Sequence, residues 1–169
     1  MSKIKSKYPR ILSITPSARG FGFALFEGQG TLADWGRREV KGNHKNKAAL
    51  SKMEELIAHC QPDILVLEDT LAEGSRRAPR IRKLSQKIIA LAAKRKVKVA
   101  LFSRKEVRQD FFADGRGSKD ETAKIIADRF PDDLGFQLPP KRPLWKSEDP
   151  RMDIFDAVAL ALVFRKRKL

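Results

Sequence analysis

Arg10–Phe26, with the sequence RILSITPSARGFGFALF, is the stretch that decides the fold. Its apolar run Ile11–Ile14 is expected to be a strand that stops at Thr15-Pro16, because proline has no N–H to give to a sheet. After a tight turn at residues 17–20, larger apolar residues alternate with smaller ones up to Phe26, which is typical of a half-buried strand. The stretch therefore predicts a β-hairpin that places Thr15 at the carboxyl end of its first strand, where open α/β sheets bind ligands.

The remainder of the chain alternates between apolar runs and amphipathic patterns. A Gly-Gln-Gly turn at 28–30 leads into a third strand, and two helix starts have the Ser-x-x-Glu spacing of a capping box. Residues 131–150 contain five prolines and no periodicity, which indicates an extended connection. The expected strands after the hairpin are Leu32–Val40, Ile64–Leu67 and Val97–Phe102, and the expected helices are His44–Gln61, Pro79–Lys96, Arg104–Ala113, Lys119–Phe130 and Arg151–Arg165.

This order of elements predicts one α/β domain over residues 1–169, built on a mixed five-stranded sheet. A basic arm (1–9) is expected before the hairpin, and a basic tail (165–169) after the last helix. No run approaches the roughly 20 apolar residues of a membrane span. Cys60 is the only cysteine, which rules out an internal disulfide and favours a cytoplasmic location. We expect it to be a small core residue.

Basic residues dominate the composition, with 36 lysines and arginines against 21 aspartates and glutamates and a formal net charge of +15. Between Gly74 and Lys105 there are twelve basic residues and no acidic one. Such a one-sided block favours nucleic acid, the commonest polyanion, although a solubilising surface would leave the same pattern. The basic side chains expected to contact nucleic acid are Arg76, Arg77, Arg80, Lys83 and Lys87.

Three acidic residues stand in apolar surroundings, where burying a charge is expensive. Glu68 follows the apolar run of the fourth strand, and the i, i+3 spacing of Asp153 and Asp156 puts both on one face of the last helix. A hard cation such as Mg²⁺ would neutralise them and would suit metal-assisted cleavage of a phosphodiester. Asp153 can equally be an acid favoured by the dipole at a helix amino terminus, so the residues alone leave a shared metal site open.

Four stretches of the chain resemble the RuvC family of Holliday-junction resolvases, which have an RNase H-like nuclease fold. They are ILSITPSARGFGFALF, PDILVLEDTL, SKDETAKIIADRF and RMDIFDAVALAL, and their order and spacing cover roughly Arg10 to Arg165. The resemblance implies a sheet in which strands 1–3 are antiparallel and strands 4 and 5 run parallel to strand 1.

The resemblance also implies roles for particular residues. Members of the family have a quartet of carboxylates that binds two Mg²⁺ ions, and they cut branched DNA as homodimers. Glu68, Asp153 and Asp156 fall on three of the four carboxylate positions. Those three are therefore the expected catalytic and metal-binding residues, for Mg²⁺ or Mn²⁺, with one ion or none as the alternatives. Lys119 falls where the family has a basic residue near the scissile phosphate, so it is also an expected catalytic residue. Leu71 falls near the family's junction-contacting segment, so it is also expected to contact nucleic acid.

Thr15 departs from the family pattern, which has Asp-Pro-Gly where this chain has Thr15-Pro16-Ser17. A hydroxyl lacks the charge and the second oxygen of the ligand expected to bridge both ions. Because two neighbouring cations repel strongly, losing that bridging charge weakens the metal pair most.

We therefore expect a nucleic-acid-binding protein, for branched or structured DNA, on a RuvC-like scaffold whose metal-dependent cleavage is weakened or lost. The alternatives are an active Mg²⁺-dependent endonuclease of the crossover-junction type and an actin-like phosphate-binding relative. The actin-like alternative is disfavoured, because the turn after Pro16 lacks the glycines that let backbone amides approach a phosphate.

Trp35 and Trp145 could stack on bases, but packing in the core or in a loop is the expected role of each.

Overall fold

Five strands form one mixed sheet, in the order β3-β2-β1-β4-β5, in the computed structural model, which describes residues 7–169. β1 pairs antiparallel with β2 and β2 with β3, whereas β4 is parallel to both β1 and β5. The expected fold class, an RNase H-like mixed sheet, is confirmed. Residues 1–6 of the expected basic arm lie outside the described residues. The strands are β1 (Ile11–Ser17), β2 (Gly20–Glu27), β3 (Thr31–Glu39), β4 (Ile64–Glu68) and β5 (Lys98–Phe102).

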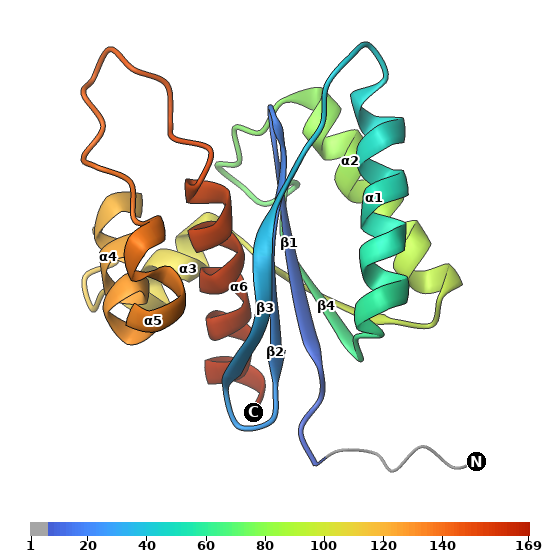
Figure 1. Cartoon of the computed structure of the whole chain (residues 1–169), viewed down its shortest axis with the longest axis horizontal. Coiled ribbons are helices and arrows are strands. Elements are labelled where there is room, and N and C mark those ends of the chain that lie inside the picture. Colours follow the sequence, from blue (N-terminus) through green and yellow to red (C-terminus); the bar gives the residue numbers. More distant parts are fainter. Residues whose placement is uncertain (1–6) are drawn as a thin grey trace.

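Helices cover both faces of the sheet (Figure 1). On one face lie α1 (Lys45–Cys60) and α2 (Pro79–Lys94). On the other face α6 (Met152–Lys168) runs along the strands, with α3 (Arg104–Phe111) and α4 (Lys119–Arg129) beside it. Short helices α5 (Pro131–Leu134) and η1 (Gly135–Gln137) follow α4. Within residues 7–169, no helix combines the length and the apolar character needed to cross a membrane.

The central strand β1 contributes alternate side chains to two separate cores, because successive residues of a strand point to opposite faces. Leu12 and Ile14 pack with α1 and α2, in the core that also holds the buried Cys60, as expected. Ile11 packs in the core on the α6 side. Ser13 and Thr15 lie on that same α6 side, where both are buried and both find hydrogen-bond partners.

Two hydroxyl groups of β1 hold α6 in register against the sheet. Ser13 Oγ donates to the carbonyl of Ala157 at 2.5 Å, and Thr15 Oγ1 donates to the carbonyl of Asp153 at 2.7 Å. The two carbonyls are four residues apart, about one helical turn, which matches two residues of strand. Gly22 pairs with Thr15 in the sheet, and a Cβ at Gly22 would overlap the Asp153 carbonyl. The amino-terminal turn of α6 therefore packs directly on backbone at this point.

Three expectations from the sequence need correction. β1 continues through Pro16 to Ser17, and this is tolerated because β4 pairs with β1 only as far as Ser13. The segment 131–150 is not wholly extended, since Pro131 suits a first helical turn and is followed by two aspartates that favour a helix start. Residues 165–168 form the last turn of α6 rather than a tail, and Arg167 there pairs with Asp110 at 2.8 Å.

Candidate functional site

A cleft of about 940 Å³ lies at the carboxyl ends of β1 and β4. Glu68, Asp153 and Asp156 all line it, together with Thr15 and Lys119. Eight basic side chains line it against five acidic ones, so the cleft is electropositive overall. The basic residues are Arg19, Lys45, Arg76, Arg77, Arg80, Arg104, Arg108 and Lys119, and the acidic ones are Glu68, Glu148, Asp149, Asp153 and Asp156.

Glu68, the last residue of β4, is held by two arginines. Arg104 Nε donates to its Oε1 at 2.8 Å, and Arg77 Nε lies 3.3 Å from its Oε2. Arg77 also donates a hydrogen bond to the carbonyl of Pro16 near the end of β1. The Arg77 guanidinium therefore connects the ends of two neighbouring strands, and both oxygens of Glu68 face a cationic side chain.

Asp153 is 7% exposed and lies in the first turn of α6. Ser17 Oγ donates to its Oδ2 at 2.6 Å, and Arg37 Nε lies 3.5 Å from the same oxygen. Burial raises the pKa of Asp153, and the neighbouring Asp156 raises it further, while the contacts with Ser17 and Arg37 oppose that rise. The Asp153 carboxylate is thus enclosed and paired from β1 and β3.

Asp156 lies one turn further along α6 and pairs with Lys119, the first residue of α4. Lys119 Nζ is 3.2 Å from Asp156 Oδ2 and also 3.2 Å from Glu148 Oε1. Desolvation raises the pKa of Asp156, with Lys119 opposing the rise and Glu148 adding to it. Lys119 is placed by the capping box that starts α4, in which Ser118 and Glu121 bond reciprocally, as expected.

The carboxylates as they lie do not fit a pair of Mg²⁺ or Mn²⁺ ions. Such ions take oxygen ligands that converge on one point, and a two-metal site needs carboxylates shared between both ions. Here each carboxylate of the predicted set is paired with its own basic side chain. Among residues 7–169, no group of three or more His, Cys, Asp or Glu side chains is arranged to hold a metal ion. A metal role for Glu68, Asp153 and Asp156 stays a prediction.

Thr15, which the resemblance to the RuvC family puts at the position of an absent ligand, uses its hydroxyl to hold α6. The hydroxyl donates to the main-chain carbonyl of Asp153, and Thr15 is 7% exposed. A carboxylate at position 15 would face that carbonyl with no proton to donate, since an ionised carboxylate only accepts hydrogen bonds. The surroundings of position 15 therefore suit a donor.

The predicted nucleic-acid contacts divide into two groups. Arg76, Arg77 and Arg80 line the cleft, and Arg80 is held there by Asn46 at 2.9 Å. Lys83 and Lys87 are exposed on α2 and do not line the cleft. Leu71 also lies outside the cleft lining, with 68% of its surface exposed. Their roles in binding stay predictions.

Sequence reasoning missed several residues of the cleft. Ser17 could have been found, because it follows Thr15 by two residues and so shares its face of β1. Arg104 could also have been found, because it comes two residues after β5, next to the end of β4. Arg37 depends on the pairing of β3 with β2, which contains a register shift, and no signal in the sequence places it beside Asp153. Glu148 lies in a segment without periodicity.

The two tryptophans have different surroundings. Trp35 is half-buried and packs against the core on the α6 side, as expected. Trp145 is 80% exposed, so packing within a loop does not account for it.

Comparisons with known proteins give a consistent result for the fold. No protein-family model matches the sequence, and no curated protein does. The structure of Thermus thermophilus RuvC is similar, with a TM-score of 0.63 at 18% identity over 91% of this chain and 92% of that one. T. thermophilus RuvC in complex with Holliday junction substrate gives a TM-score of 0.64 at 17% identity over 92% of each chain. The yeast mitochondrial Holliday junction resolvase gives 0.60 at 14% identity over 93% of this chain and 78% of that one. The chain therefore has a RuvC-like fold.

Proposed function

We propose that this chain binds branched or structured DNA in the cleft at the carboxyl ends of β1 and β4, and that its metal-dependent cleavage is weakened or lost. The observation that carries the proposal is the pairing of Glu68 with both Arg77 and Arg104. The resemblance to the RuvC family implies a metal-binding carboxylate at this position, whereas in this chain the Glu68 carboxylate is paired with two guanidinium groups. Guanidinium groups bind phosphate oxygens well in their own right.

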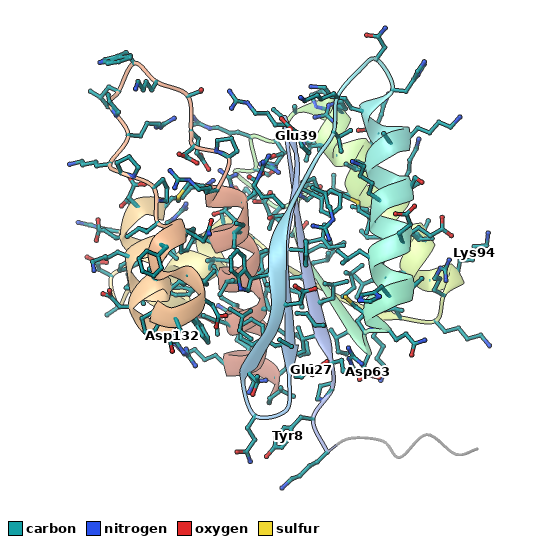
Figure 2. The ribbon with its side chains drawn as sticks, in the orientation of Figure 1. Tyr8, Glu27, Glu39, Asp63, Lys94 and Asp132 are labelled. Carbon is teal, nitrogen blue, oxygen red and sulfur yellow. The ribbon has the colours of Figure 1, made fainter. Side chains whose placement is uncertain are left out.

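The distribution of charge supports binding at this end of the molecule. Arg76 and Arg108 line the cleft and are exposed, which leaves them accessible to phosphates. Glu27 and Asp63 lie at the opposite end of the sheet (Figure 2). There Arg10 is paired with Glu27 at 2.7 Å, and the Arg10 backbone N–H donates to Asp63. The similar fold of a RuvC solved with Holliday junction substrate supports DNA as the nucleic acid.

Binding is tested by measuring fluorescence anisotropy with junction, duplex and RNA duplex probes over a range of salt concentrations. We expect the affinity to fall steeply with salt, since each phosphate contact on duplex DNA contributes about −0.9 to the slope of log K against log salt. Replacing Arg76 and Arg108 with Ala should make the slope of log K against log salt less negative, by the contribution of about two phosphate contacts. The matched control replaces Lys94 and Lys98 with Ala, because these exposed residues lie away from the cleft lining. An affinity that does not change with salt would refute the proposal.

Cleavage is tested on the same junctions with Mg²⁺ or Mn²⁺. We expect little or no product from the wild-type chain. The alternative, an active crossover-junction endonuclease, is favoured by one observation, that Glu68, Asp153 and Asp156 line a single cleft. Rapid cutting that Glu68→Gln abolishes would establish that alternative.

Two further parts of the proposal concern assembly and location. We propose that the chain acts as a homodimer, as the resemblance to the RuvC family implies, and in the cytoplasm. Light scattering after size-exclusion chromatography would then give twice the 19.2 kDa of one chain. A mass of one chain at all concentrations, with junction binding intact, would refute the homodimer alone.

A further inference from the structure

The segment between η1 and α6 presents two large apolar side chains to solvent. Trp145 is 80% exposed and Leu144 is fully exposed. The backbone N–H of Lys146 donates to the carbonyl of Pro143 at 3.1 Å, so these four residues form a turn with Leu144 and Trp145 at its tip. Exposing an indole costs free energy, because tryptophan is among the side chains that gain most from burial. An aromatic side chain held at the tip of a turn is therefore expected to have a partner.

The turn lies beside the cleft. Residues 147–150, which follow it directly, line the cleft, and Figure 1 shows the segment rising at the same end of the molecule as the first turn of α6. Two ion pairs hold its base: Lys119 with Glu148 at 3.2 Å, and Arg151 with Asp149 at 2.9 Å. Trp145 is thus only two residues from Ser147 in the cleft lining, on a segment anchored at that side.

The charges around Trp145 identify the class of partner. Lys141, Arg142 and Lys146 are all exposed on the same segment, and Lys146 Nζ lies 5.1 Å from the centre of the Trp145 ring. Protein–protein interfaces are depleted in lysine at their cores, so this surrounding is unlike that of a protein-binding aromatic. An aromatic ring flanked by cations is the combination that binds single-stranded nucleic acid, in which the ring stacks on a base and the cations contact phosphates.

We propose that Trp145 stacks on an unpaired base of the nucleic acid that the cleft holds. This inference rests on the proposed function and adds a preference to it: substrates with unpaired nucleotides next to a duplex bind more tightly than blunt duplexes. Stacking tolerates any base, because every base has a π-face, so the preference is for strand structure and not for sequence.

The test compares two anisotropy probes, a blunt duplex and the same duplex with a thymidine overhang, at one salt concentration. Trp145→Ala should weaken binding of the overhang probe by about 5- to 150-fold, the range expected for one stacked base, and leave the blunt duplex unchanged. Trp145→Phe should restore most of the affinity, since it keeps an aromatic face. Phe136→Ala is the matched control, because Phe136 is 91% exposed but does not line the cleft.

A second measurement reports stacking directly. The chain has two tryptophans, so Trp35→Phe leaves Trp145 as the only one. Its fluorescence should be quenched by oligothymidine and should saturate at the concentration at which the anisotropy does.

Several outcomes would overturn the inference. Unchanged overhang binding by Trp145→Ala, or an equal loss for both probes, would exclude stacking on an unpaired base. A Trp145→Ala protein with unchanged overhang binding and an altered oligomeric state would assign the turn to contacts between copies instead. If the wild-type chain binds the blunt duplex and Trp145→Ala has no effect, the proposed function stands without this inference. A wild-type chain that binds neither of these probes nor the junction probe would overturn both this inference and the proposed function.

Discussion

The guanidinium of Arg77 lies against the carboxylate of Glu68, with Nε 3.3 Å from Oε2. Both side chains are largely enclosed, with 20% and 16% of their surfaces exposed. Arg104 holds the other carboxylate oxygen at 2.8 Å. Glu68 therefore acts in this arrangement as an anchor for two cationic groups that face the cleft.

Replacing Glu68 with Gln should strengthen nucleic-acid binding. The change removes a negative charge from the cleft and frees Arg77 and Arg104 to contact phosphates. A gain of roughly threefold to tenfold is expected, the equivalent of about 1 kcal/mol. Anisotropy titration measures it, and Glu55→Gln, an exposed residue of α1 away from the cleft lining, controls for the change in net charge. A loss of affinity in Glu68→Gln would mean that the ion pairs organise the binding surface.

Replacing Thr15 with Asp should destabilise the protein without adding cleavage. The variant loses the hydrogen bond to the Asp153 carbonyl and places an acceptor against it in a buried position. The expected loss is about 1–3 kcal/mol in the free energy of unfolding, measured by urea denaturation. Thr15→Ser keeps the donor and should lose less. A Thr15→Asp protein as stable as the wild type that gains Mg²⁺-dependent cleavage would show that the metal site can be rebuilt.

Replacing Gly22 with Ala should disturb the position of α6. The added methyl group would overlap the Asp153 carbonyl, so the helix or β2 must shift. Overpacking of this kind costs about 1–3 kcal/mol. Gly135→Ala is the control, since a Cβ there meets no atom within 4 Å and its backbone is helical. Equal unfolding free energies for the two variants would contradict this close approach of α6 to β2.

Replacing Arg167 with Met should remove a pH-dependent contribution to stability. The hydrogen bonds from Arg167 lower the pKa of Asp110, so the folded state favours the ionised carboxylate. The ion pair of Arg167 with Asp110 has a forked geometry and contributes about 1 kcal/mol to the free energy of unfolding. This contribution is complete above the pKa of Asp110 in the unfolded chain, about 3.9, and it is lost as the pH falls through the lower pKa of Asp110 in the folded protein. Unfolding at pH 7 and at pH 3 should show the difference between wild type and variant shrinking. A difference that does not change with pH would assign the effect to packing of the arginine stem.

Local signals in the sequence were sufficient for most of the fold. The alternation around Phe21–Phe26, the continuous apolar run before Glu68 and the capping boxes at Ser103 and Ser118 act over a few neighbouring residues, and each was confirmed. The same signals placed Thr15 and Glu68 each near the carboxyl end of a strand. The structure shows that these two strands are parallel neighbours in the sheet. What they missed locally was the helix after Pro131, whose composition resembled that of a loop.

The sequence by itself determined the sheet, its flanking helices and the end of the sheet at which the charged residues gather. Only the tertiary structure decided what those charges do. The pairing of Arg37 with Asp153 spans 116 residues of sequence, and that of Arg104 with Glu68 spans 36. Such partners are set by strand register and by the docking of α6 on Ser13 and Thr15, in which a shift of one residue would exchange the faces of a strand. Local patterns specify elements, whereas the neutralisation of each carboxylate depends on how distant elements pack.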